Sequence, residues 1–255
     1  MDLNDSIDAL KRRLSLDDHP YFAAIEQGRF GREDFVETQI QFMFAVVFFS
    51  RPMAVLASRL PRPEMRMSIL HNVFEEHGEG DLRLSHEKTF IRLLRGLGVS
   101  FEQIEARALW PEVRAFNTAL TGVCAHDDPI TAVAAMGMIE DLFSGFSARL
   151  GRGIVANGWL GEDDLVHYGT HEVLDEEHAE EFYAIIRPMW AASARARYQI
   201  TQGLELGAYL FTRLYRDLYE ARTRRDRRDV EGPHSVSEGW YLSSAWFDVP
   251  REDKK

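Results

Sequence analysis

Apolar side chains recur at spacings of three and four residues along almost the whole chain, which is the pattern of helices that bury one face. No stretch alternates apolar and polar residues between tight turns, as a strand of a sheet would. Glycines and prolines separate the helical stretches by short loops, and helices joined in this way pack as a bundle. The sequence therefore predicts an all-α domain of about seven helices.

The helical pattern divides the chain into consecutive segments. Helices are expected over residues 6–14, 33–60, 64–73, 82–96, 101–107, 111–122, 128–151, 162–187 and 191–220. Pro52 predicts a kink in the second segment, and Pro61 and Pro63 predict its end. The segment over 128–151 is apolar on most faces, so it is expected at the centre of the bundle.

The composition changes after Ala221 to the arginine-rich stretch RTRRDRRD, which is expected to face solvent. We therefore expect the helical domain over residues 1–225 and a C-terminal tail over residues 226–255. The tail carries large aromatic side chains, namely Trp240, Tyr241, Trp246 and Phe247. Because this is too much apolar surface to leave in water, the tail is expected to pack on the bundle or on a second subunit.

The composition also limits the class of partner. The formal net charge is -11, which argues against nucleic acid, because phosphate binding needs a basic surface. Cys124 is the only cysteine, so no disulfide and no cysteine metal site is expected. The most apolar stretch, FMFAVVFF, is shorter than the roughly 20 residues of a membrane span, and the acidic N-terminus lacks a signal-peptide pattern. The sequence predicts a cytoplasmic protein with a small-molecule substrate and no membrane partner.

The segment HYGTHEVLDEEHAEEFY, residues 167–183, is rich in groups that bind metals. On an ideal helix, His171, Asp175 and His178 fall within an arc of roughly 60° and so point the same way. The alternative is an acidic surface helix that carries histidines by chance. The remaining acidic residues are expected to face solvent, namely Glu172, Glu176, Glu177, Glu180 and Glu181. His167 and Tyr168 are expected either to support the ligands or to be structural.

The segment FEEHGEGDLRLSH, residues 74–86, offers further carboxylates and histidines. On a regular helix Glu79 and His86 share a face, whereas Glu76 would sit roughly 80° from His86. Gly78 and Gly80 can break the helix, so both glutamates remain candidates at this point.

Glu140 lies in AAMGMIEDLFSGF, within the most apolar helix of the chain. A buried carboxylate is costly unless it is paired or bound to a metal, and the alternatives are an exposed position or a salt bridge with an arginine. Helical bundles build dimetal sites from glutamates and histidines that project inward from facing helices. A mixed set of nitrogen and oxygen donors suits iron or manganese better than structural zinc.

With these motifs, the sequence resembles the haem-oxygenase-like diiron oxidases, iron-containing redox enzymes related to the thiaminase and pyrroloquinoline-quinone-forming oxidase folds. The resembling stretches are QFMFAVVFFSRPMAVLASRLP, NVFEEHGEGDLRLSHEKTFIRLLRGLG, MGMIEDLF and HEVLDEEHAEEFY. The resemblance covers roughly residues 20–211, and its most specific part is the His-x3-Asp-x2-His triplet that begins at His171. It implies a haem-oxygenase-like seven-helix bundle and a homodimer.

By this resemblance, the iron ligands and catalytic residues would be Glu76, His86, Glu140, His171, Asp175 and His178. The EE-x-G-x-GD pattern favours Glu76 for the first position, with Glu79 as its alternative. Some relatives take a further carboxylate from the early long helix. The corresponding residues 46–50 contain none, so no such ligand is expected here.

The implied function is that of a non-haem diiron oxidoreductase that uses O2 to oxidise a small molecule resembling an amino acid or a fatty acid. Two Fe(II)/Fe(III) ions would act through a peroxo-type diferric intermediate, with C–C cleavage, decarboxylation, desaturation or N-oxygenation as outcomes. One alternative is a metal-free, thiaminase-like or cofactorless relative, for which Cys124 is the available nucleophile. A second alternative is a helical metal-binding protein without catalytic activity.

Overall fold

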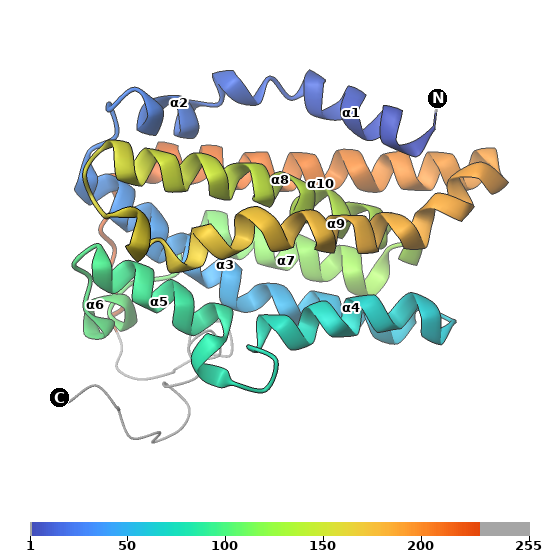
Figure 1. The fold of residues 1–255 in the computed structure, drawn as a ribbon, viewed down its shortest axis with the longest axis horizontal. Coiled ribbons are helices and arrows are strands. Elements are labelled where there is room, and N and C mark those ends of the chain that lie inside the picture. The colour runs from blue at the N-terminus through green and yellow to red at the C-terminus, as the bar shows by residue number, and fades with distance from the viewer. Residues whose placement is uncertain (1, 230–255) are drawn as a thin grey trace.

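The computed structural model describes residues 2–229, apart from the side chains of residue 166 and residues 169–176. Within this part, the chain forms ten α-helices: α1 (Leu3–Arg13), α2 (Pro20–Glu26), α3 (Arg32–Arg59), α4 (Pro63–Glu76), α5 (His86–Gly96), α6 (Phe101–Glu105), α7 (Pro111–His126), α8 (Pro129–Ala156), α9 (Val166–Ala192) and α10 (Ala194–Ala221). The long helices run along one axis, with α1 and α2 across one side of the bundle and α4 and α5 along the other (Figure 1). The same described residues form no strand, so the all-α prediction is confirmed.

The helix number exceeds the seven expected because short helices accompany the long ones. α2 has seven residues and α6 has five. The expected segments do not include α2, which begins at Pro20 as its first residue. α3 continues through Pro52 and ends at Arg59, just before the two prolines that predicted its end.

The apolar helix α8 lies at the centre of the bundle, as its sequence predicted. It packs against α2, α3, α7, α9 and α10. Every residue from Thr131 to Glu140 is buried, so this stretch has no face turned to water. A helix covered on all sides must be apolar on all sides, which explains why α8 shows no polar stripe.

Glycines allow the three longest C-terminal helices to lie unusually close together. A Cβ atom at Gly207 of α10 would lie 2.3 Å from the carbonyl oxygen of Ala135 of α8, and Gly203 makes the same kind of contact one turn earlier. At Gly137 of α8, a Cβ would lie 2.8 Å from the Cβ of Phe182 of α9. No larger side chain fits at such distances, so these glycines fix α8 between its two neighbours.

The arginine-rich stretch after α10 is largely exposed, as expected, and ion pairs tie it to the bundle. Arg224 lies 2.8 Å from Glu112 of α7, and Arg225 lies 2.6 Å from Asp34 of α3. The guanidinium of Arg224 also covers the ring of Trp110, at 5.2 Å from its centroid. These partners are far away in sequence, so a local sequence pattern does not reveal them.

The predicted tail enters the described structure only at its beginning. The backbone nitrogen of Ala108 donates to the carbonyl oxygen of Asp226 at 3.2 Å, and that of Arg228 donates to Ala106 at 3.0 Å. Residues 230–255, with the four aromatic side chains, lie outside the described residues. The packing of the tail therefore stays a prediction.

Two helices of the described chain, α3 and α8, are long and apolar enough to cross a membrane by length and composition. Their apolar windows are 67% and 83% buried inside the fold. Burial of this extent is what the core helices of a bundle need, and it accounts for their hydropathy.

Candidate metal centre

A tight loop brings the last residue of α4 and the first residue of α5 together. Gly78 turns the chain with a φ of +75°, and a Cβ there would lie 2.2 Å from the carbonyl oxygen of Asp81. Only glycine fits this position. Ser85 then caps α5, because its hydroxyl accepts the backbone N–H of Lys88 at 3.4 Å. The glycines of this segment thus interrupt the helix, as the sequence suggested.

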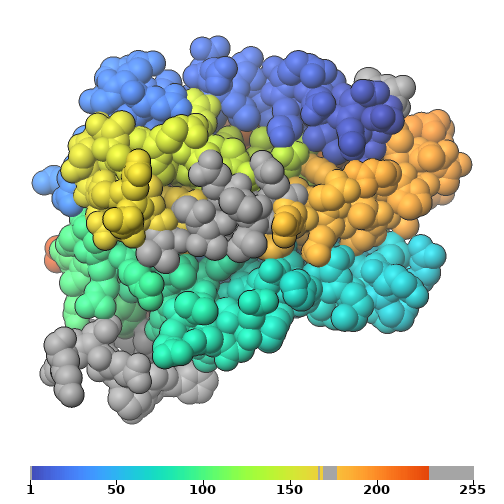
Figure 2. Space-filling model, in the orientation of Figure 1, coloured from blue at the N-terminus to red at the C-terminus, as the bar shows by residue number. Residues whose placement is uncertain are grey.

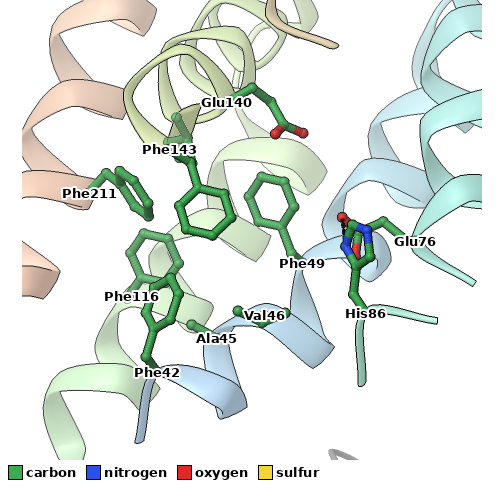
Figure 3. Close-up of a pocket in the computed structure, with 11 residues that line it drawn as sticks. Phe42, Ala45, Val46, Phe49, Glu76, His86, Phe116, Glu140, Phe143 and Phe211 are labelled. Carbon is green, nitrogen blue, oxygen red and sulfur yellow. Dashed lines mark ion pairs between the residues drawn. The ribbon is translucent and has the colours of Figure 1, made fainter. Parts of the chain in front are cut away.

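Glu76 and His86 form the first acid–imidazole pair at this junction (Figure 3). Oε1 of Glu76 lies 2.8 Å from Nδ1 of His86, and the side chains are 10% and 11% exposed. Glu79 lies in the loop between α4 and α5, where it is exposed and has a φ of +52°. The regular helix that would have put Glu79 and His86 on one face is not formed. The structure therefore brings Glu76, and not Glu79, to His86.

Glu75 and His178 form a second pair, between α4 and α9. Nε2 of His178 lies 2.9 Å from Oε2 of Glu75, and the His178 side chain is 6% exposed. Glu75 was not among the predicted ligands. Glu75 was overlooked because the helix was expected to end at Val73, whereas α4 continues to Glu76.

Glu140 is buried on α8 and is 3% exposed. Its Oε1 accepts a hydrogen bond of 3.0 Å from the amide Nδ2 of Asn72 on α4. The other end of that amide, Oδ1 of Asn72, is buried and has no hydrogen-bond partner among the described residues. Asn72 was also missed, because an asparagine on a helix carries no metal-binding signal of its own.

One face of α4 contacts every predicted ligand whose side chain the structure describes. At roughly 100° per residue, Asn72, Glu75 and Glu76 fall within an arc of about 100°. These residues gather side chains from three other helices at the end of α4, namely His86 of α5, Glu140 of α8 and His178 of α9. The end of α4 is thus the point where carboxylates and imidazoles from four helices meet.

An apolar pocket opens beside this cluster and holds about 420 Å³ of space, part of it open to solvent. Among its described lining residues only Glu76, His86 and Glu140 are polar, and they lie on one side of the pocket (Figure 3). The other walls are apolar, formed by Phe42, Ala45, Val46, Phe49, Phe116, Ile139, Phe143 and Phe211. The early long helix, α3, therefore presents apolar residues to the pocket.

His167 and Tyr168 begin α9 in buried positions. Nδ1 of His167 lies 3.1 Å from the hydroxyl of Thr89, and its ring centroid is 5.9 Å from that of His86. The Tyr168 hydroxyl donates to the side-chain oxygen of Gln39 on α3, and burial raises the pKa of Tyr168 well above its usual value. These contacts anchor the start of α9 to α5 and α3. Tyr168 thus has a structural role in this arrangement.

His171 and Asp175 lie among the residues whose side chains are outside the described part of the structure. Their backbone belongs to α9, the helix that also carries His178. Their assignment as ligands stays a prediction based on helical spacing and on the sequence resemblance.

Comparison with known proteins gives one family and two named relatives. Residues 36–211 match the family described as iron-containing redox enzyme. A protein named 4-aminobenzoate synthase from Chlamydia muridarum is 24% identical over 187 residues, which are 73% of this chain and 78% of that protein. The protein of the same name from Chlamydia trachomatis serovar D is 22% identical over 209 residues, 80% of this chain and 89% of that protein.

Several solved structures share the fold. A domain of unknown function with a haem-oxygenase-like fold from Shewanella denitrificans superposes with a TM-score of 0.72 at 15% identity, over 88% of this chain and 94% of that chain. A TenA homologue from Pseudomonas syringae pv. tomato gives 0.64 at 16%, over 85% and 90%. A CADD-like protein of unknown function from Nostoc punctiforme gives 0.64 at 16%, over 86% and 99%. The predicted haem-oxygenase-like fold is confirmed.

Proposed function

The chain belongs to the family of iron-containing redox enzymes, and we propose that it is an O2-dependent oxidase with two iron ions bound at the end of α4. The proposed ligands are Glu76, His86, Glu140, His171, Asp175 and His178. The observation that carries this proposal is the convergence of carboxylates and imidazoles from α5, α8 and α9 on one face of α4. Glu75 contacts His178 and is proposed as a further oxygen donor.

The residues present fit such a centre. Carboxylate oxygens and imidazole nitrogens are donors that iron accepts, and the described cluster contains both kinds. The acid–imidazole pairs hold these side chains in place, and the protons that they share can leave when a cation binds. The buried Oδ1 of Asn72 adds an acceptor without a described partner, beside Glu140. An interior of this kind suits a bound ion with its water better than an apolar core.

Iron bound here would supply the O2 reduction that protein side chains cannot perform. The side chains have separate tasks. Asn72 orients Glu140 by its hydrogen bond, and the pairs with Glu75 and Glu76 orient the two histidines. The phenylalanines of the pocket exclude water from the reacting face.

The apolar lining of the pocket supports a substrate with an apolar or aromatic part. No lysine or arginine lies among its described lining residues, so no permanently charged cation there would pair with a distant carboxylate of the substrate. The name of the chlamydial relatives refers to an aromatic product, which is compatible with such a pocket. We propose oxidative cleavage, decarboxylation, desaturation or N-oxygenation of a small molecule of this kind.

The thiaminase-like alternative needs a reactive cysteine, and Cys124 is poorly suited. The thiol is fully buried on α7, and burial raises its pKa to about 12. Cys124 is also not among the described residues that line the pocket. A thiol that stays protonated and away from the pocket is a weak nucleophile, so the oxidase is the better supported function.

Anaerobic loading with Fe(II) tests the proposal. We expect two iron ions per chain to remain after desalting, and O2 uptake to rise when apolar or aromatic amino acids and fatty acids are added. Measurement of iron by a chelator assay and of O2 with an electrode decides the outcome. A chain that retains no iron contradicts the proposal. If iron is bound but the O2 consumed never exceeds the amount needed to oxidise that iron, the chain is instead a metal-binding protein without turnover.

The His178→Ala variant is expected to lose about half of the retained iron, since a ligand of one of the two ions is removed. The far-UV circular dichroism spectrum should stay helical, because the loss of one side chain near the middle of α9 does not unfold the helix. His77→Ala is the matched control. His77 is an exposed histidine at the end of α4, and its ring contacts only the carbonyl oxygen of Val73 among the interactions described. Wild-type iron content in His178→Ala would contradict the assignment.

A further inference from the structure

The pocket beside the proposed centre has two ends of different character. Its polar end is formed by Glu76, His86 and Glu140. This end lies next to the contact between α4 and α9, whose second half borders α4 on the face of the molecule shown in Figure 2. The opposite end is apolar and is built from α3, α7, α8 and α10 (Figure 3). A molecule that binds here must therefore fit the shape of the apolar end.

Four phenylalanine side chains close the apolar end, and each comes from a different helix. Between ring centroids, Phe143 of α8 lies 5.7 Å from Phe42 of α3 and 5.8 Å from Phe211 of α10. Phe116 of α7 lies 6.2 Å from Phe211. Aromatic rings attract one another at tilted and edge-on arrangements of this spacing, so the rings hold one another in place. We call these four side chains the phenylalanine cage.

Further aromatic side chains fill the space behind the cage. Phe146 stacks on Phe211, with centroids 5.4 Å apart and an interplanar angle of 9°. Tyr215 lies 5.4 Å from Phe211 and 5.1 Å from Phe146, and both Phe146 and Tyr215 are buried. The pocket therefore cannot extend past Phe211 without displacing a close-packed interior.

Ala45 is the smallest of the described residues that line the pocket. It is buried, and it lies on the stripe of α3 that also contributes Phe42, Val46 and Phe49. Residues at these spacings share one face of a helix. Protein interiors are normally filled by side chains, so a methyl group between larger neighbours leaves space. Ala45 thus provides part of the room that the pocket occupies.

The pocket is small for a ligand site. Its volume of about 420 Å³ includes space that is open to solvent. Ligand pockets span roughly 300–1,000 Å³, so this one lies near the lower limit. An apolar cavity of about 150 Å³ already holds benzene. A single ring therefore fits beside Ala45, whereas an extended chain needs a longer channel than the cage leaves.

We propose that Ala45 and the phenylalanine cage restrict the substrate to a molecule with one compact apolar group, of the size of a single aromatic ring, and exclude long unbranched chains. Ala45 provides room for the ring, and the cage limits its length. A molecule resembling an aromatic amino acid meets these limits, and a fatty acid does not. That the bound molecule is the substrate of an iron centre rests on the function proposed above, whereas its binding in the pocket does not.

A packing defect in the core is the simpler explanation of the space beside Ala45. A defect would be enclosed by apolar side chains on all sides. This pocket instead reaches Glu76, His86 and Glu140 at one end and is partly open to solvent. A site for a molecule that enters from solution explains both features.

Isothermal titration of the iron-free, full-length chain with phenylpropanol and n-nonanol tests the selection. The two alcohols have the same head group and the same number of carbon atoms. Nonanol is the more hydrophobic, so it would bind more tightly if burial of apolar surface alone decided the affinity. We expect phenylpropanol to bind more tightly instead, by about tenfold. Equal affinities, a preference for nonanol, or no binding of phenylpropanol would overturn the proposal.

The Ala45→Leu variant tests the room for the ring. Its larger side chain should weaken the binding of phenylpropanol by about tenfold or more, because it occupies the same space. Ala54→Leu is the matched control, since it makes the same change at an exposed position of α3 and should bind like the wild type. If Ala45→Leu melts early, the smaller step Ala45→Val replaces it. Unchanged binding in a folded Ala45 variant would rule out the role of this residue.

The Phe116→Ala variant tests the limit on length. It opens the cage and should raise the affinity for nonanol by about tenfold relative to Phe30→Ala. Phe30 is equally a buried phenylalanine, but it is not among the described residues that line the pocket. Equal affinities in the two variants would contradict the role of the cage. Failure of the diiron proposal looks different, because the wild type would then retain no iron while the iron-free chain still prefers the ring.

Discussion

Replacement of Glu76 by glutamine should lower the affinity for iron by more than about 100-fold, since even groups that merely orient metal ligands are worth 10- to 100-fold. Glu79→Gln should leave the iron retained after desalting unchanged. The reason is the loop that follows Gly78. It places Oε1 of Glu76 2.8 Å from His86 and leaves Glu79 exposed.

The measurement is iron content and binding affinity in the two glutamine variants, with helical content as the check on folding. Glutamine keeps the size of the side chain and removes its charge, so packing changes little. The opposite result, loss of iron in Glu79→Gln alone, would mean that the loop rearranges on metal binding and that the register based on Glu76 is wrong. His86→Ala should lose iron whichever glutamate is the ligand.

Gly207→Ala should lower the free energy of unfolding by about 3 kcal/mol, the upper range for forcing extra atoms into a packed interior. The added Cβ would lie 2.3 Å from the carbonyl oxygen of Ala135, so α10 must move away from α8. For a domain of this size, the midpoint of thermal unfolding should fall by roughly 6–12 °C.

Gly145→Ala on α8 is the matched control. A Cβ there meets no atom within 4 Å among the described residues, and the position is exposed. Alanine is the better helix former, so this change should raise stability by about 1 kcal/mol. Thermal and urea unfolding followed by circular dichroism measure both variants. Similar stability of the two alanine variants would show that the close contact of α8 and α10 is not maintained in solution.

The helices could be predicted because their signals are local. Apolar periodicity, Pro111 and Pro63 as first residues, and the apolar run of α8 lie within the segments that they define. The centre of the fold could be recognised for the same reason. The tie between the arginine-rich stretch and the bundle could not, since Asp34 and Glu112 lie far away in sequence.

The site could be predicted only in part. A histidine or glutamate within an apolar pattern is visible in the sequence, whereas the identity of its neighbour depends on where a helix ends. Because α4 was expected to end at Val73, the face shared by Asn72, Glu75 and Glu76 was not recognised. The contact of His178 with Glu75 depends on the packing of α9 against α4, which spacing along one helix does not determine. The homodimer and the cytoplasmic location stay predictions.

Both members of the Glu76–His86 pair occupy helix ends, and the nine residues between them form a turn that closes on itself at Gly78. The loop after that glycine can accommodate insertions or deletions while the two helix ends stay in place. The number of residues between the two proposed ligands can thus change while the pair stays in contact. Searches that require a fixed gap between glutamate and histidine will overlook proteins with the same centre, and a search anchored on the two helix boundaries will find them.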